Sequence, residues 1–197
     1  MVDERELGSD PIAALRAWLA EAERAADRPQ VMTLATATPD GLPSARIVLL
    51  RGLDEGGLVF FTNRESRKSQ EIRTNPRAAL VLHWWDLGRQ VRVEGAVEEI
   101  ARSDSAEYWE TRPRVSRIAG WASAQSRPLA DREELDAAYA DAEARFAGGD
   151  VPLPDHWGGY RVLPETVEFW RHRESRLHDR VRFTRASDGW RRERLAP

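Results

Sequence analysis

The sequence contains no cysteine, which excludes disulfides, thiolate metal sites and a cysteine nucleophile. It has no apolar run near the roughly 20 residues that a membrane-spanning helix needs. Residues 1–11 are acidic and polar, whereas a secretory signal has a basic start and an apolar stretch. The net charge is only -3, which does not favour a general nucleic-acid or membrane-surface role. We therefore expect a soluble cytoplasmic protein.

Several common site motifs are also missing. The four histidines do not have the spacing of metal ligands, and neither an H-E-x-x-H motif nor a glycine-rich phosphate loop occurs. We therefore expect no metal site and no nucleotide-binding fold of those types. With 197 residues, the chain is long enough for one compact domain over residues 1–197. We expect residues 1–8 to form a flexible segment.

Short apolar runs separated by turn signals dominate the chain. In particular, residues 46–50 and 58–62 are predicted to form a β-hairpin through the acidic glycine turn at residues 54–57. We count about seven strands, in consecutive hairpins without βαβ units, which is typical of an antiparallel barrel. The strand-like segments are residues 31–38, 44–50, 58–62, 78–85, 90–98, 160–170, 179–185 and 190–195.

Three or four helices are expected around this barrel. Ser9, Asp10 and Pro11 form a helix-start signature, followed by apolar residues at helical spacing from Ile12 to Ala22. Further helices are predicted at residues 66–75, 103–111 and 131–146. Residues 112–116 and 120–127 are interpreted as loops, and residues 151–160 as a rigid connection. The fold class is thus mainly β with peripheral helices (α+β).

Four cations, Arg46, Arg51, Arg67 and Lys68, bracket the predicted hairpin. Together with nearby hydroxyls and a helix start at Ser66, they are suited to an anionic group such as a phosphate. The alternative is that they are solvated ends of strands and a helix. Arg46 and Arg51 are an odd number of residues apart, so a regular strand would point them to opposite faces. A shared ligand therefore requires a bulge, a strand end or backbone contacts.

A second charged cluster follows Trp170. If this segment is extended, Arg176, His178 and Arg180 share one side and present two fixed cations and one titratable imidazole. Three interpretations stay open: a ligand site, a nucleic-acid groove in which Trp170 stacks on bases, or an edge strand protected by charge. Tyr108 and Arg112, one helical turn apart, are either ligand contacts or plain helix surface.

Taken together in chain order, these segments resemble the pyridoxamine/pyridoxine 5′-phosphate oxidase family, flavin enzymes of the split β-barrel fold. The resemblance extends from about residue 10 to residue 197. It is carried by RIVLLR at 46–51, FTN and ESRK within 61–68, RQVRVEG at 89–95, Y-x-x-x-R-P-x-x-S at 108–116, WAS and QS within 121–126, VPLP and WGGY within 151–160, EFW at 168–170, RLHDR at 176–180 and the terminal RLAP.

The resemblance implies flavin mononucleotide (FMN) as cofactor, with its phosphate on Arg67 and Lys68. The implied FMN site comprises Arg46, Ile47, Val48, Leu49, Phe61, Thr62, Arg67, Lys68, Gln90, Gln125, Ser126, Trp170 and Arg180. It also implies a homodimer with two active sites at the subunit interface. A partner chain could then complete either cation cluster.

The implied activity is an oxidase of vitamin B6 metabolism. Hydride would pass from the C4′ atom of pyridoxine or pyridoxamine 5′-phosphate to flavin, and dioxygen would become hydrogen peroxide, leaving pyridoxal 5′-phosphate. The substrate phosphate would contact Arg51, Tyr108, Arg112 and Ser116. Arg176 and His178 would lie over the pyridine ring as catalytic residues that orient and stabilise it, and neither is assigned as an obligatory base.

Three departures from the family pattern bear on the substrate. Arg51 replaces the usual lysine, and Arg171-His172 follows EFW where relatives have Gln-Gly. The amino-terminal extension that helps cover the active site in relatives is largely missing before Ser9. Two alternatives therefore accompany the main one: an oxidase of another small aromatic, as in phenazine biosynthesis, or a non-catalytic protein that binds flavin or pyridoxal phosphate.

Overall fold

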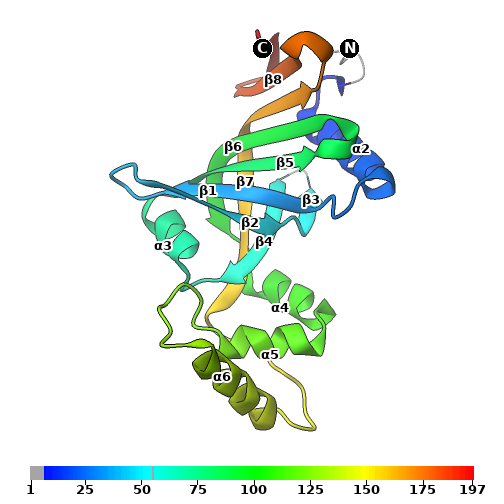
Figure 1. Ribbon diagram of the computed structural model, residues 1–197. Helices are drawn as coiled ribbons and strands as arrows, with labels where there is room; N and C mark the ends of the chain where they lie inside the picture. The colour runs from blue at the N-terminus through cyan, green and yellow to red at the C-terminus, as the bar shows by residue number, and fades with distance from the viewer. Residues whose placement is uncertain (1–6, 55) are drawn as a thin grey trace.

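The computed structural model describes residues 7–54 and 56–197. Its described part is one curled, antiparallel sheet with helices around it (Figure 1). The strands are β1 (Val31–Ala37), β2 (Pro43–Leu49), β3 (Gly52–Asp54), β4 (Gly57–Asn63), β5 (Arg77–Trp84), β6 (Arg89–Glu99), β7 (Trp157–Arg171), β8 (Asp179–Ala186) and β9 (Gly189–Arg194). The α-helices are α2 (Pro11–Ala25), α3 (Arg67–Thr74), α4 (Arg102–Thr111), α5 (Arg114–Ala122) and α6 (Arg132–Arg145).

The 15-residue strand β7 pairs with three other strands of the sheet. One edge of β7 pairs with β6 throughout, while the other edge pairs first with β4 and then with β8. The sheet therefore splits along β7. A register shift in β6 lies at Gly95, where a Cβ would stand 1.8 Å from the Leu163 carbonyl oxygen, so only glycine fits this close approach. The predicted antiparallel split barrel is confirmed.

Helix α2 covers one face of the sheet. It begins as predicted, because Asp10 Oδ1 accepts a hydrogen bond from the Ile12 amide at 2.8 Å and Pro11 opens the first turn. Its apolar residues are buried in the core, where the ring of Trp18 meets Phe169 edge-on at 5.0 Å. Of the segment 1–8, residues 1–6 lie outside the described residues, and Leu7 is buried.

The predicted hairpin between residues 46–50 and 58–62 is wrong in its first arm. Strand β2 pairs with β1, and the partner of β4 in the hairpin is β3, with Leu53 opposite Leu58. The chain leaves β2 after Leu49 and crosses to a new neighbour, since the Arg51 amide donates to the Val59 carbonyl. The turn itself is as predicted, with Asp54 Oδ1 accepting from the amides of Gly56 and Gly57.

Three further boundaries correct the sequence interpretation. Residues 114–122 form helix α5 where loops were predicted, because Ile118 packs into a small core with Trp109. Strand β7 begins at Trp157, inside the segment interpreted as a connection. Nine strands are described where about seven were expected. The predicted helices at residues 66–75, 103–111 and 131–146 correspond to α3, α4 and α6.

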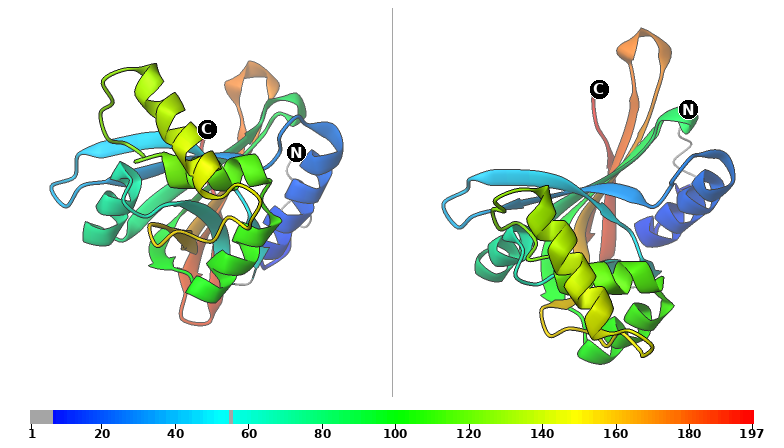
Figure 2. Two further views of the ribbon diagram at one scale, coloured as in Figure 1. Left: turned by 90° about the horizontal axis from the view of Figure 1, so that it is seen from below. Right: turned by 60° about the horizontal axis from the view of Figure 1, so that its bottom comes forward.

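The two ends of β7 lie at opposite ends of the molecule. Helices α4, α5 and α6 gather near its start, whereas the β7–β8 connection and the C-terminus lie at the far end (Figures 1 and 2). A strand of this length spans roughly 45 Å at about 3.3 Å per residue. Residues at its two ends therefore cannot contact one ligand within one chain.

Candidate functional site

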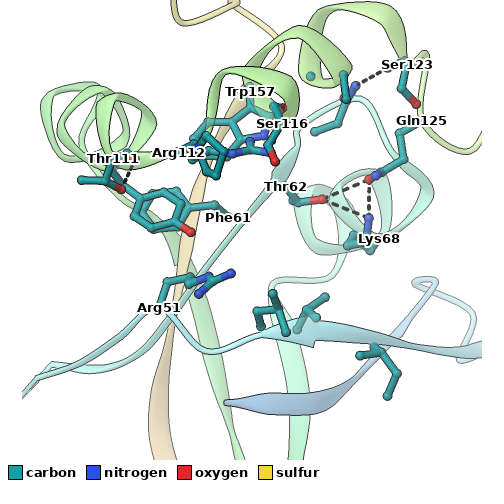
Figure 3. A pocket seen from close by; sticks show the side chains of 18 residues that line it. Arg51, Phe61, Thr62, Lys68, Thr111, Arg112, Ser116, Ser123, Gln125 and Trp157 are labelled. Atoms are coloured by element: carbon teal, nitrogen blue, oxygen red, sulfur yellow. Dashed lines mark hydrogen bonds between the residues drawn. The ribbon is translucent and has the colours of Figure 1, made fainter. Parts of the chain in front are cut away.

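A pocket of about 740 Å³ opens between the sheet and helices α4 and α5 (Figure 3). Its volume lies in the range of pockets that bind small molecules. It is lined by Ile47, Val48, Leu49, Arg51, Phe61, Thr62, Asn63, Lys68, Tyr108, Thr111, Arg112, Pro113, Ser116, Ala119, Gly120, Ser123, Gln125 and Trp157. The pocket thus brings together two of the four cations of the first charged cluster, part of the flavin site, and all four residues that the resemblance assigned to the substrate phosphate.

Lys68 is a buried cation in this pocket. Its Nζ donates to Gln125 Oε1 at 2.7 Å, Thr62 Oγ1 at 3.0 Å and Ser66 Oγ at 3.1 Å (Figure 3). Burial, and then the nearby Arg46 guanidinium, lower the pKa of Lys68 to about 8. No carboxylate among the described residues pairs with this ammonium group, and a buried cation without a counter-charge is costly. The site therefore fits an anion such as a phosphate.

Arg46 and Arg67 lie outside the pocket lining, and both contact Glu71. The terminal nitrogens of Arg46 donate to Thr36 Oγ1, Ser44 Oγ and the Leu34 carbonyl, and one lies 3.3 Å from Glu71. Arg67 Nε donates to Glu71 Oε1 at 2.8 Å. Helix α3 starts after Ser66 as predicted, although the Ser66 hydroxyl accepts from Lys68 and does not cap the helix.

An aromatic wall forms the opposite side of the pocket. The Phe61 ring stacks on Tyr108 at 4.0 Å and is nearly parallel to Trp157 at 5.3 Å. Gly159 makes this possible, because a Cβ there would stand 2.8 Å from the Phe61 ring. Trp157 was not predicted as a site residue, although the WGGY motif that contains it was part of the resemblance. Asn63, which donates to the Ser123 carbonyl at 3.3 Å, was also missed.

Two guanidinium groups flank this wall. The Arg51 guanidinium lies 5.9 Å from the centre of the Tyr108 ring, and that of Arg112 lies 4.7 Å from Trp157. Arg112 also donates to the Ser116 carbonyl at 3.1 Å. Burial lowers the pKa of Arg112, and the Arg51 charge acts in the same direction. Two adjacent cations that repel each other form a second place suited to an anion.

The odd spacing of Arg46 and Arg51, which would place them on opposite faces of a regular strand, is explained within one chain. Strand β2 ends at Leu49, so Arg51 lies beyond it and strand alternation does not apply. Arg46 points toward Glu71 and Arg51 into the pocket. The four cations of the first cluster therefore divide between two places.

The remaining predicted residues lie at the far end of β7. Gln90, Trp170 and Arg180 are neighbours across β6, β7 and β8. Arg180 makes two hydrogen bonds to Glu168, at 2.8 Å and 3.0 Å. The Trp170 ring lies 4.7 Å from His178, whose Nδ1 accepts from the Arg173 amide at 3.2 Å. These residues form a second cluster, separate from the pocket.

The condition under which Arg176, His178 and Arg180 would share one side, an extended segment, is not met before β8 begins at Asp179. Residues 174–176 form a short 3₁₀ turn, η2 (Glu174–Arg176), and Ser175 and Arg176 have φ of 60° and 59°. Arg176 is exposed in this turn, and only Arg180 belongs to a strand. Ser126 is also exposed, with φ of 74°, and lies outside the pocket, whereas its neighbour Gln125 lines it.

No helix in the described part is long and apolar enough to cross a membrane. Among residues 7–54 and 56–197, no group of three or more histidines and carboxylates could hold a metal ion. The chemistry of the pocket is thus that of cations, aromatic rings and hydroxyls.

Sequence models of known families cover most of the chain. Residues 19–146 match the family described as pyridoxamine 5′-phosphate oxidase. The chain belongs to this family. Residues 157–197 match its C-terminal dimerisation region, described as that of pyridoxine 5′-phosphate oxidase. The second cluster, Trp170 to Arg180, thus lies within the dimerisation region.

Curated relatives of high similarity carry one name. Proteins named pyridoxine/pyridoxamine 5′-phosphate oxidase are 54% identical in Rubrobacter xylanophilus, over 95% of this chain and 87% of that protein, and 52% identical in Azorhizobium caulinodans, over 95% and 90%. The relative from Pseudomonas paraeruginosa is 48% identical over 100% of this chain and 93% of its own length. The similarity therefore extends over both clusters.

Solved structures share the fold. PhzG from Burkholderia lata, in complex with tetrahydrophenazine-1-carboxylic acid, is 34% identical with a TM-score of 0.93, covering 100% of this chain and 97% of that one. A pyridoxamine 5′-phosphate oxidase-related, FMN binding protein from Nostoc punctiforme has a TM-score of 0.77 at 18% identity, covering 97% and 100%, which supports the fold alone.

Proposed function

We propose that this chain is an FMN-dependent oxidase that converts pyridoxine 5′-phosphate or pyridoxamine 5′-phosphate to pyridoxal 5′-phosphate. Its relatives at about 50% identity carry the name of that enzyme, and the chain matches 87–93% of their length. The observation that carries the proposal is the division of one pocket into two anion sites, Lys68 on one side and Arg51 with Arg112 on the other. A flavin phosphate and a substrate phosphate require two such sites.

The flavin phosphate would be held by Lys68 and Arg67. Ile47, Val48, Leu49 and Thr62 would line the cofactor, and Gln125 would fix Lys68. When bound, FMN would accept a hydride and return electrons to dioxygen, forming hydrogen peroxide. The protein supplies position and charge for that chemistry.

The substrate phosphate would bind Arg51, Arg112, Tyr108 and Ser116. Charge-assisted hydrogen bonds to a phosphate contribute about 1.5–3 kcal/mol each. The wall of Phe61, Tyr108 and Trp157 excludes water from one side of the pocket and keeps the two arginines apart from Lys68.

We also propose that two chains complete each active site. Within one chain, Arg176 and His178 lie at the opposite end of β7 from the pocket, so they can reach a substrate only in the pocket of another subunit. The C-terminal dimerisation region that contains them supports this arrangement. The chain would then be a single FMN-binding split-barrel domain that works as a homodimer, and its location in the cytoplasm stays a prediction from the sequence.

A flavin oxidase acting on a phenazine precursor is the second candidate, because the PhzG structure is similar over the full chain. The two candidates differ in one feature of the substrate, since only pyridoxine and pyridoxamine phosphates carry a phosphate for Arg51 and Arg112. The relatives near 50% identity favour the phosphate substrates.

The test is an absorption spectrum followed by a peroxide assay. The purified protein should show flavin absorption and release hydrogen peroxide with pyridoxine or pyridoxamine 5′-phosphate. Unphosphorylated pyridoxine and a reduced phenazine carboxylic acid serve as comparison substrates. Peroxide only with the phenazine would favour the second candidate, and bound flavin without peroxide from any substrate would indicate a carrier.

A further inference from the structure

Glu71 is a buried carboxylate to which the proposed mechanism assigns no role. It lies in α3 and only 5% of it is exposed. Its Oε2 accepts from Thr36 Oγ1 at 2.5 Å and Ser44 Oγ at 2.6 Å, while its Oε1 accepts from Arg67 Nε at 2.8 Å. Arg46 Nη2 adds a longer contact of 3.3 Å. One side chain thus connects β1, β2 and α3.

The contacts keep Glu71 ionised despite its burial. Desolvation acts to raise the pKa of Glu71, but hydrogen bonds from Ser44, Thr36 and Arg67, with the Arg67 charge, outweigh it and lower the pKa to about 2. A carboxylate that is satisfied in this way holds its partners in fixed positions at neutral pH.

The same contacts fix the direction of two arginines. Because Arg67 Nε is bound to Glu71, the plane of its guanidinium is set, and its two terminal nitrogens have no hydrogen-bond partner among the described residues. Arg46 is held by Glu71, Thr36 and Ser44, close enough to Lys68 to affect its titration. Arg67 is 56% exposed at its side chain, so without Glu71 it would sample many rotamers.

We propose that Glu71 is a positioning residue for the flavin phosphate. It holds Arg46 and Arg67 beside Lys68 before the ligand arrives, so that the site selects a flavin that carries a phosphomonoester. This inference rests on the proposed FMN site. It assigns to Glu71 a part in the discrimination between FMN and riboflavin at that site.

Two effects of Glu71 oppose each other. Its negative charge lies close to a site for an anion, so Coulomb interaction alone predicts that neutralising Glu71 strengthens phosphate binding. Positioning predicts the reverse, because each arginine that is free before binding loses rotamer entropy on binding. The sign of the change therefore distinguishes the two effects.

The experiment measures the dissociation constants of FMN and riboflavin for the apoprotein by quenching of flavin fluorescence. Glu71→Leu, which accepts no hydrogen bond, should lower the ratio of FMN affinity to riboflavin affinity about tenfold, with riboflavin itself little changed. Glu71→Gln is neutral but keeps one carbonyl acceptor, and we expect it to retain part of the ratio. The control is Glu65→Gln, an exposed carboxylate just before α3.

A double variant tests whether Glu71 acts through Arg67. Arg67→Met should lower the same ratio of FMN affinity to riboflavin affinity. In the Arg67→Met background, Glu71→Gln should then lower this ratio by a smaller factor than it does in the wild type. An unchanged or increased ratio in Glu71→Gln and Glu71→Leu would overturn the inference, as would full additivity with Arg67→Met. If Glu71→Leu does not fold, the nearly isosteric Glu71→Gln decides between these outcomes. A wild-type protein that binds FMN no better than riboflavin would overturn the phosphate site itself, and this inference with it.

Discussion

The two ends of β7 differ in how far one chain satisfies its own charges. At the start of the strand, Lys68 is buried and Arg112 half-buried in the pocket, and each has a defined hydrogen-bond partner. At the far end, Arg176 is exposed in the η2 turn and makes no hydrogen bond or ion pair with any described residue. One chain thus forms the pocket around the first pair of cations, whereas it leaves Arg176 exposed.

The difference explains why neither charged cluster could be interpreted alone. Anion binding belongs to the pocket end, where cations are desolvated and act strongly. Orientation of the substrate ring is the role we propose for Arg176 and His178 at the far end, where His178 lies beside Trp170. The following predictions test this division of roles, beginning with the largest expected effect.

Arg176→Ala should lower kcat/KM by roughly 10²–10³-fold, as expected when a charged group that stabilises the reacting ring is removed. FMN content should stay at the wild-type level, because we assign the flavin phosphate to Lys68 and Arg67 and give Arg176 no contact with the cofactor. Steady-state peroxide assays and the flavin absorption of the purified variant check both points. Arg185→Ala, farther along β8 beside Trp190, is the matched control. Turnover equal to the wild type in the Arg176 variant would contradict the assignment.

Arg51→Ala should raise KM for pyridoxine 5′-phosphate about 10- to 100-fold, the loss expected for one charge-assisted hydrogen bond. The kcat/KM for unphosphorylated pyridoxine should hardly change, because Arg51 is assigned to the phosphate. Arg51→Lys should recover much of the affinity, since lysine restores the positive charge, although it lacks the paired donors of the guanidinium group. If Arg51→Ala impaired the reaction equally with both substrates, Arg51 would be assigned to the pyridine ring and not to the phosphate.

The pKa of Lys68 predicts a pH dependence of FMN binding. In the free protein Lys68 loses its proton as the pH rises through about 8, and a phosphate dianion favours the protonated form. FMN affinity should therefore be constant just below pH 8 and fall by up to about tenfold per pH unit above it. Fluorescence titrations from pH 6.5 to about 9.5 measure this.

The comparison ligand is riboflavin, whose affinity should be independent of pH over that range because it has no phosphate. Lys68→Arg should remove the fall in FMN affinity above pH 8, since arginine stays charged. A fall of the same size with riboflavin would assign the titration to another group.

Local signals in the sequence predicted most of the helices and strands. Asp10 caps α2 as expected, because a side-chain oxygen at a helix start acts within a few residues, and Asp131 caps α6 in the same way. Helix α5 was missed since Pro113 and Gly120 are loop signals, and the packing of Ile118 against Trp109 depends on residues far away in the chain.

The candidate site was predictable as a set of residues, and less so as a geometry. The cations and the motif order indicated the pocket residues, yet strand pairing is non-local, so β4 was expected to pair with β2, although its hairpin partner is β3. The turn at Ser175 and Arg176 has left-handed backbone that local sequence signals do not indicate, so the sequence could offer an extended segment only as a condition. Glu71 carried no motif signal, because its role comes from contacts with three separate elements.

Subunit complementation tests the central claim, that each active site takes residues from both ends of β7 in two different chains. Arg51→Ala and Arg176→Ala proteins are unfolded together, refolded as a mixture and assayed for peroxide release at a substrate concentration well below the wild-type KM, where each variant alone has little activity. In half of the dimers one site would then carry both changes and the other neither, so activity should return to about a quarter of the wild-type value. A mixture no more active than the two separate variants, with heterodimers demonstrated by differently tagged subunits, would contradict the account.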